Sequence, residues 1–105
     1  MPLGAVCGTQ REVRTIKIGI LGDFDPGYRT HLATDASLRH AARALGVEVE
    51  ARWVPTPSLV EPGVEATLES LDGVWASAGS PYKSTEGMLA GIRLARSRNW
   101  PFVAT

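Results

Sequence analysis

The chain has 105 residues, with 11 basic and 11 acidic side chains, 44% hydrophobic residues and one cysteine, Cys7. This length fits a single domain, and the balanced charge excludes the polybasic surfaces that bind nucleic acids and anionic membranes. One cysteine forms neither an internal disulfide nor a multi-thiolate metal site, and no apolar run is long enough to cross a membrane. We therefore predict a cytoplasmic protein with no nucleic-acid, membrane or metal partner.

The chain begins with a segment that lacks a regular period. Residues 1–14 show neither helical nor strand periodicity, so we interpret them as a flexible arm before a domain at residues 15–105. A short β-branched run then starts at Ile16 and stops at Gly22, which is typical of a buried parallel strand. The residues that follow, 23–27, form a turn-rich loop.

An amphipathic helix is predicted over residues 30–45. Its apolar side repeats at i, i+3, i+4 and i+7, through Leu38, Ala41, Ala42 and Leu45. Its charged side repeats every four residues, through Asp35, Arg39 and Arg43. Gly46 follows the last turn, where a helix end favours a residue in the left-handed conformation.

The elements after this helix are shorter. Residues 47–54 alternate apolar and polar side chains with a period of two, which predicts a strand near a sheet edge. A proline-rich loop leads to a short helix after Pro62, and residues 73–76 form a third short strand. Small side chains at 77–81 then form a loop that precedes a second long helix.

The second long helix is expected to end at Asn99, and residues 102–105 begin a fourth strand. The basic side chains in its last turns are interpreted as a solvated face whose positive charges interact favourably with the helix dipole: Arg93, Arg96 and Arg98. Strands and helices thus alternate, which predicts an α/β fold with a flavodoxin-like, doubly wound parallel sheet. The fourth strand has an unpaired apolar edge, so we expect the chain to be loosely folded, aggregated, or paired with a second copy through that edge as a homodimer.

In such a sheet, ligands bind at the carboxyl ends of the strands. The small residues Ser77, Ala78, Gly79 and Ser80 would let backbone N–H groups approach an anion or an oxyanion, although these residues on their own favour a plain turn. Asp23 and Asp25 follow the first strand as in an acidic metal pocket. The third strand, however, ends in Ala76 without a phospho-accepting aspartate, which favours both aspartates as turn formers.

The remaining candidate groups give weaker signals. His31 and His40 lie nine residues apart on the first helix and share no metal-binding face, and His40 is expected to be partly packed. Cys7 has no histidine or charged helix end near it in the sequence, which indicates a structural or incidental thiol. A dinucleotide fingerprint is absent, because the glycines after the first strand lack its spacing.

With these loops placed, residues 13–105 resemble the first half of the class I glutamine amidotransferase domain of the CTP synthase C-terminal type. The matching stretches are residues 16–22, 36–41, 47–54 and, without a gap, 71–102. Two further motifs resemble a stand-alone branch of this family, in which some members carry selenocysteine. They are Asp-Phe-Asp-Pro at residues 23–26 and Thr-His-Leu-Ala-Thr at residues 30–34.

The resemblance implies a hydrolase that releases ammonia from glutamine or another small amide for pyrimidine nucleotide biosynthesis, with no cofactor in this domain. It implies that the Gly79 N–H helps to form the oxyanion hole, with Ala78 and Ser80 beside it. We place the substrate crevice at Asp23, Phe24 and Glu86. The family's loop reads Pro-Gly-Gly-Phe-Gly, whereas the loop at residues 77–81 keeps only one of these three glycines.

The resemblance also places the nucleophile, a cysteine or a selenocysteine, immediately after Thr105, with its histidine and glutamate further on. We therefore expect residues 15–105 to be the N-terminal half of such a domain, truncated after its fourth strand and inactive alone. A selenocysteine codon misread as a stop would explain the position, and a boundary chosen for other reasons is the alternative. One competing interpretation is a non-catalytic small-ligand or protein-interaction module on the same fold. Another is a self-sufficient flavodoxin-like domain that binds a nucleotide, which the missing fifth strand disfavours.

Overall fold

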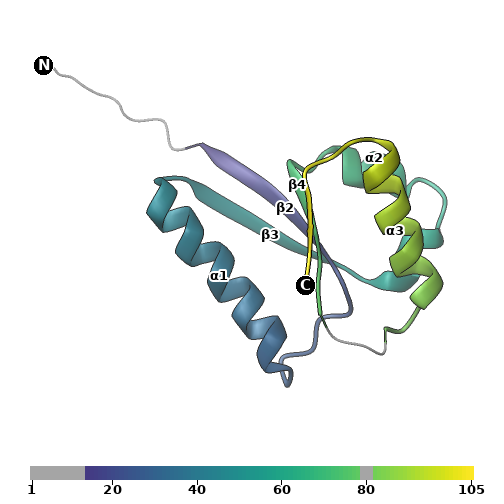
Figure 1. The fold of residues 1–105 in the computed structure, drawn as a ribbon, viewed down its shortest axis with the longest axis horizontal. Coiled ribbons are helices and arrows are strands. Elements are labelled where there is room, and N and C mark those ends of the chain that lie inside the picture. The colour runs from purple at the N-terminus through teal and green to yellow at the C-terminus, as the bar shows by residue number, and fades with distance from the viewer. Residues whose placement is uncertain (1–13, 79–81) are drawn as a thin grey trace, which may run out of the picture.

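The computed structural model describes residues 14–78 and 82–105. Four parallel strands form one sheet in the order β3-β2-β4-β5 (Figure 1). Their bounds are β2 Thr15–Leu21, β3 Glu48–Val54, β4 Gly73–Ala76 and β5 Phe102–Ala104. The predicted parallel α/β sheet is confirmed, and so is the position of β3 at its edge. The expectation of a flexible arm falls almost entirely on residues outside the described ones.

The helices lie on both faces of the sheet, as a doubly wound fold requires. Figure 1 shows α1 on one face, and α2 and α3 on the other. Their bounds are α1 Arg29–Leu45, α2 Val64–Glu69 and α3 Thr85–Ser97, with a 3-10 helix, η1, at Thr56–Val60. The chain passes from β3 across β2 to β4, so the carboxyl ends of β2 and β4 flank the point where the strand order reverses. No helix among the described residues is long and apolar enough for a membrane span.

Two helix ends follow from local chemistry. Gly46 has φ +70°, and its N–H caps the end of α1, as predicted. The 3-10 helix η1 was not predicted, because its prolines indicated a loop. Pro57 lies in the first turn of η1, where a missing N–H costs no hydrogen bond, so a proline-rich segment still forms one short turn of helix.

The main core lies between the sheet and the helices η1, α2 and α3. Its buried members are Leu21, Val54, Leu59, Leu68, Val74, Ala76 and Met88. Strand β2 pairs with β3 along its whole length, from Thr15 opposite Glu48 to Leu21 opposite Val54, and it pairs with β4 on its other side. This central position leaves Ile20 and Leu21 with no exposed surface.

The other face of the sheet is less well covered, which corrects the expected packing of α1. Of its predicted apolar stripe only Ala42 is buried, whereas Ala41 is exposed and Leu45 is 74% exposed. These side chains line an apolar groove of about 150 Å³ against Ile16 and Val49 of the sheet. The stripe therefore faces the sheet as predicted but does not close on it.

Two further side chains on α1 differ from expectation, and a third side chain, at the end of α3, has partners that were not expected. His40 is exposed rather than partly packed, because it lies off the stripe that His31 and Ala42 share. Asp35 was expected on the charged side, yet its Oδ1 accepts a hydrogen bond from the indole N–H of Trp53 at 3.0 Å. Arg98, the residue that caps the end of α3, is exposed as expected, as are Arg93 and Arg96, and it also forms ion pairs with Glu65 and Glu69 of α2. Such exposed pairs stabilise a fold by about 1 kcal/mol at most.

Candidate functional site

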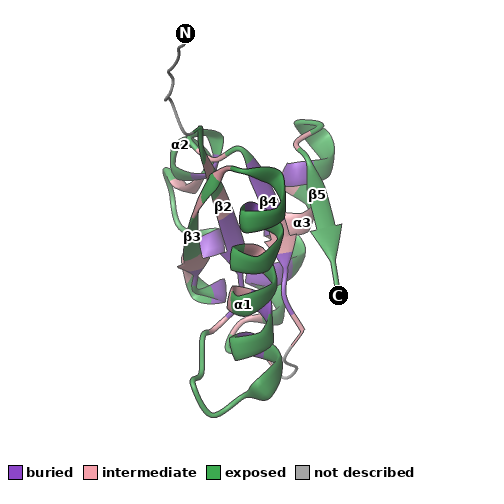
Figure 2. Ribbon diagram, turned by 90° about the vertical axis from the view of Figure 1, so that its left-hand side faces the viewer, coloured by how far each residue is buried: buried purple, intermediate pink, exposed green. Residues whose placement is uncertain are grey.

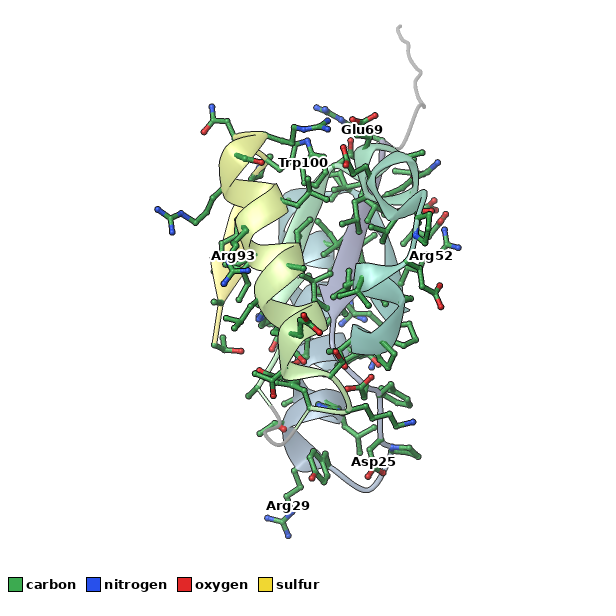
Figure 3. All side chains as sticks on the ribbon, turned by 90° about the vertical axis from the view of Figure 1, so that its right-hand side faces the viewer. Asp25, Arg29, Arg52, Glu69, Arg93 and Trp100 are labelled. Atoms are coloured by element: carbon green, nitrogen blue, oxygen red, sulfur yellow. The ribbon has the colours of Figure 1, made fainter. Side chains whose placement is uncertain are left out.

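The loops that follow β2, β3 and β4 meet at the carboxyl edge of the sheet. Figure 3 shows Asp25 and Arg29 at this end of the molecule, and Glu69 and Trp100 at the opposite end. Small residues allow the close approach of these loops. A Cβ on Gly22 would lie 2.2 Å from the hydroxyl of Ser77, and one on Gly87 would lie 1.9 Å from the carbonyl oxygen of Thr56. Larger side chains at either position would push the loops apart.

Asp23 joins the three loops through its carboxylate. Its Oδ1 accepts a hydrogen bond from the backbone N–H of Thr56 at 2.9 Å. Its Oδ2 accepts from the Thr56 hydroxyl at 2.8 Å and from the backbone N–H of Lys83 at 2.9 Å. Thr56 is fully buried, and its hydroxyl oxygen accepts in turn from the N–H of Ser84 at 2.9 Å. One carboxylate and one hydroxyl therefore fix the start of α3 against the ends of β2 and β3.

This network also decides the charge state of Asp23. Burial alone would raise the pKa of its carboxyl, but three hydrogen bonds to the charged form and the nearby Lys83 ammonium act in the opposite direction. The hydrogen bonds come from the N–H of Lys83 and from the hydroxyl and N–H of Thr56. Together they hold the pKa of Asp23 below its ordinary value, so the group is a carboxylate at neutral pH.

His31 forms a second connection between the same loops. It is 2% exposed, and its Nδ1 accepts a hydrogen bond from the backbone N–H of Asp25 at 3.0 Å. Its Nε2 lies 3.1 Å from the carbonyl oxygen of Ala78, which can only accept. A neutral imidazole has one donor and one acceptor, so this arrangement assigns the proton to Nε2 and uses both nitrogens. His31 is therefore not free to act as a general base.

Aromatic rings surround the imidazole. Trp53 of β3 lies with its ring centroid 4.7 Å from that of His31, and Tyr28 lies at 5.0 Å. Phe24 stacks on the same ring at 6.0 Å and contacts Trp53 at 5.0 Å. Phe24 is nevertheless 43% exposed and Tyr28 39% exposed, so both present apolar surface at the carboxyl edge.

The loop between β4 and α3 is held at both of its described ends. Ser77 is fully buried, and its hydroxyl donates to the carbonyl oxygen of Leu21 at 3.1 Å. The carbonyl oxygen of Ser77 accepts from the Tyr82 hydroxyl at 2.7 Å. Ser84 caps α3 by accepting from the N–H of Gly87 at 2.9 Å. The loop therefore enters and leaves the carboxyl edge at fixed points.

The predicted site residues have different outcomes. Gly79 and Ser80 lie outside the described residues, so their oxyanion role stays a prediction, while Ala78 is held by His31. Glu86 is exposed in the first turn of α3. Asp23, Phe24 and Glu86 all lie on loops or helix starts at the carboxyl edge, and the crevice that they were expected to form stays a prediction as well.

The turn-former interpretation is right for one aspartate and wrong for the other. Asp25 accepts a hydrogen bond from the N–H of Gly27 at 2.8 Å, which is a local turn contact. Asp23 instead bonds Thr56 and Lys83, far away in the sequence. Sequence analysis missed the partners of Asp23 and considered His31 only as a metal ligand. The Pro-Thr-Pro sequence around Thr56 was the available signal, since two prolines fix the backbone on either side of it.

Metal or ligand sites of other kinds are less well supported. Among residues 14–78 and 82–105, no group of three His, Cys, Asp or Glu side chains could hold a metal ion. A surface groove of about 280 Å³ lies beside the network, between the end of β3, η1 and α2. Its lining mixes Arg52 and Glu61 with Trp53 and Pro62, and it has no convergent set of polar groups.

No family model matches the chain. It is similar to curated CTP synthases: 33% identical over 90 residues to that of Thermosynechococcus vestitus, and 35% identical over 88 residues to that of Synechococcus sp. strain JA-3-3Ab. The CTP synthase of Staphylococcus epidermidis is 32% identical over 87 residues. These alignments cover 83–86% of this chain but only 16–17% of each relative. The chain thus spans about a sixth of the length of the relatives that it matches.

The fold has a counterpart among solved structures. The glutaminase domain of Trypanosoma brucei CTP synthase, solved with bound acivicin, superposes with a TM-score of 0.74. The superposition covers 85% of this chain and 35% of that domain's chain, at 23% sequence identity. This likeness shows a shared fold and agrees with the sequence alignments.

Proposed function

Because the chain is homologous to CTP synthase over most of its length and has the fold of that enzyme's glutaminase domain, we propose that it forms part of a glutamine-hydrolysing site. The reaction is hydrolysis of the side-chain amide of glutamine, or of another small amide, with release of ammonia. In a CTP synthase-like protein this ammonia serves pyrimidine nucleotide biosynthesis.

The end of β5 carries this proposal. The N–H of Thr105 donates to the carbonyl oxygen of Ala76 at 3.1 Å, and its hydroxyl oxygen accepts from the Trp75 indole at 3.2 Å. A residue directly after Thr105 would therefore enter the carboxyl edge beside Ser77 and Ala78. The family resemblance assigns the nucleophile to the position directly after Thr105 and the oxyanion residue to the position after Ala78. In this proposal, the nucleophile and the oxyanion donor therefore lie at the same edge of the sheet.

The chemistry needs a nucleophile and an oxyanion donor within reach of one carbonyl group. A thiolate or selenolate attacks the amide carbon, and the π electrons of the carbonyl move to its oxygen, where backbone N–H groups stabilise the charge. Collapse of this intermediate breaks the C–N bond, and ammonia leaves with a proton from a general acid. Water then cleaves the thioester or selenoester to give glutamate. The acid and base come from outside residues 1–105 in this proposal, because both nitrogens of His31 are engaged.

The proposal is tested on the product of the gene in its own cells. An affinity tag at the N-terminus isolates this product, and mass spectrometry identifies the residue after Thr105. We expect a cysteine or selenocysteine there, covalent labelling of that residue by an electrophilic glutamine analogue, and release of glutamate from glutamine. The 105-residue chain is the matched control and should release none, because residues 14–78 and 82–105 combine no positioned nucleophile with a base.

Two results would overturn the proposal. One is a natural product that carries no nucleophile after Thr105 and releases no glutamate. The other is glutamine hydrolysis by the 105-residue chain itself. Saturable binding of glutamine without any turnover in the natural product would instead favour a non-catalytic binding module, which is consistent with the internal engagement of Asp23 and His31.

A further inference from the structure

The loop after β4 contains two consecutive peptide groups whose carbonyl oxygens are held by different side chains. The Ser77 oxygen accepts from the Tyr82 hydroxyl, which belongs to the same loop. The Ala78 oxygen is bonded by Nε2 of His31, which belongs to α1 and lies 47 positions away in the sequence. Because a peptide group is planar, a carbonyl oxygen held in place also fixes the plane of that peptide. His31 therefore fixes the orientation of the Ala78 carbonyl group.

The proton on His31 is directed to Nε2 by the turn that precedes α1. Asp25 accepts from the N–H of Gly27 through its carboxylate and from the N–H of Tyr28 through its backbone oxygen. This turn presents the Asp25 N–H to Nδ1 of His31, and an N–H donor at Nδ1 requires that nitrogen to be unprotonated. The turn thus selects the tautomer whose other nitrogen can donate to Ala78.

The rings around His31 keep this geometry. Trp53 packs against the imidazole, and the hydrogen bond from its indole to Asp35 fixes Trp53 itself. Phe24 and Tyr28 cover the remaining surface and leave the His31 side chain nearly without solvent contact. A buried imidazole with both nitrogens bonded has one orientation open to it, since a ring flip would leave two buried polar groups unpaired.

We propose that His31 is a positioning residue, whose Nε2–H orients the carbonyl group of Ala78 and thereby the start of the loop that follows β4. The inference rests on the proposed function in one respect, because that function assigns the oxyanion donor to this loop. His31 itself touches neither substrate nor nucleophile. Through its two hydrogen bonds, His31 links the turn at Asp25 to the start of the loop after β4.

Two substitutions separate the two hydrogen bonds of His31. In His31→Gln the amide nitrogen can replace Nε2 and donate to Ala78. In His31→Asn the amide oxygen can replace Nδ1 and accept from Asp25, but no donor reaches Ala78. The measurement is NMR of the 105-residue chain labelled with ¹⁵N and ¹³C, which reads the imidazole tautomer from the nitrogen shifts and the Ala78 hydrogen bond from its carbonyl shift.

We expect the Nε2–H tautomer in the wild-type chain, an Ala78 carbonyl shift that His31→Gln preserves, and loss of that hydrogen-bonded shift in His31→Asn. Signals of Val74 in the core should be unchanged in both variants, as the control for folding. An Nδ1–H tautomer in the wild-type chain would overturn the proposal even if neither variant folds. So would an Ala78 shift that is the same in all three chains.

These readouts need no turnover, so a failed glutaminase assay would leave the role of His31 standing, and the reverse also holds. If the natural product hydrolyses glutamine, His31→Asn should lower its kcat by about 100-fold at unchanged KM, since a small displacement of a catalytic group has effects of this order. His31→Gln should restore most of that loss. Equal kcat values for the wild type and His31→Asn would contradict the positioning role.

Discussion

The two faces of the sheet differ in how completely they are covered. The face under η1, α2 and α3 holds the buried cluster that includes Leu59, Leu68 and Met88. On the other face, α1 packs mainly over β3 and leaves apolar grooves of about 150 Å³ and 220 Å³. Figure 2 also shows that β5, at one side of the sheet, is exposed along its whole length. Apolar periodicity thus tells which way a side chain points, but it does not tell whether anything covers it.

The closed face should respond most strongly to added volume. In Gly87→Ala the new Cβ would lie 1.9 Å from the carbonyl oxygen of Thr56, which is backbone and cannot move without displacing η1. We expect a loss of unfolding free energy on the order of 4 kcal/mol, above the usual range for overpacking. Urea unfolding followed by circular dichroism measures it.

Gly91→Ala is the matched control on the same helix. Its Cβ would meet side-chain tips, the Cδ1 atoms of Leu21 at 2.9 Å and of Leu59 at 3.2 Å, which can give way. The helix propensity of alanine offsets part of this cost by about 1 kcal/mol. Equal losses for Gly87→Ala and Gly91→Ala would show that the contact between α3 and η1 is looser than described.

Removal of volume should separate the two faces directly. Leu68 is 1% exposed in the core, so Leu68→Ala should lower the unfolding free energy by about 3 kcal/mol through lost burial and a residual cavity. Leu45 is 74% exposed on α1, and Leu45→Ala should change it by about 0.5 kcal/mol or less. A large effect of Leu45→Ala, measured in the same urea titration, would mean that the groove under α1 is filled in solution.

The carboxylate of Asp23 joins the loops after β2, β3 and β4 at the carboxyl edge, and its contribution to stability depends on pH. Its folded pKa lies below the unfolded value, so its stabilisation is full at neutral pH and is lost as the pH falls below about 4 through the folded pKa. We expect Asp23→Asn to cost about 2 kcal/mol at pH 7, because the amide is a poor acceptor for three donors. The difference from the wild type should shrink in acid.

Asp25→Asn is the control for this effect, since the asparagine oxygen can still accept from the N–H of Gly27. Urea titrations at neutral and acidic pH compare both variants with the wild type. If the unfolding free energy fell equally steeply with pH in acid for the wild type and Asp23→Asn, the role assigned to the Asp23 network would be refuted.

The smallest effect on stability is expected at the open edge of β5. Val103 is 53% exposed, and β5 pairs only with β4 among the described strands. We expect two copies of the 105-residue chain to associate through this edge, and Val103→Lys to weaken the association, because a lysine on an edge strand opposes pairing. Sedimentation velocity over a range of concentrations measures this. A wild-type chain that stays monomeric throughout would contradict the prediction.

The sequence by itself determined the strands, the α-helices and their order, but not the 3-10 helix η1. The β-branched run that starts at Ile16, the alternation around Glu50, the helical stripe at Ala42 and the glycine at 46 depend on chain geometry over a few residues. They therefore predicted strands, helix and helix end correctly. The parallel sheet followed, because strands joined through helices have few arrangements open to them. The resemblance to the glutamine amidotransferase domain depended on the same local stretches, and the alignments with CTP synthase agree with it.

Only the tertiary structure decided which groups meet at the carboxyl edge. Asp23 finds Thr56 and Lys83 at separations of 33 and 60 residues, and His31 finds Ala78 at 47. Nothing local selects these partners, since a carboxylate or an imidazole can bond any donor or acceptor that the fold brings near it. The same holds for burial: the stripe of α1 was visible in the sequence, but its exposure depends on where the helix lies over the sheet.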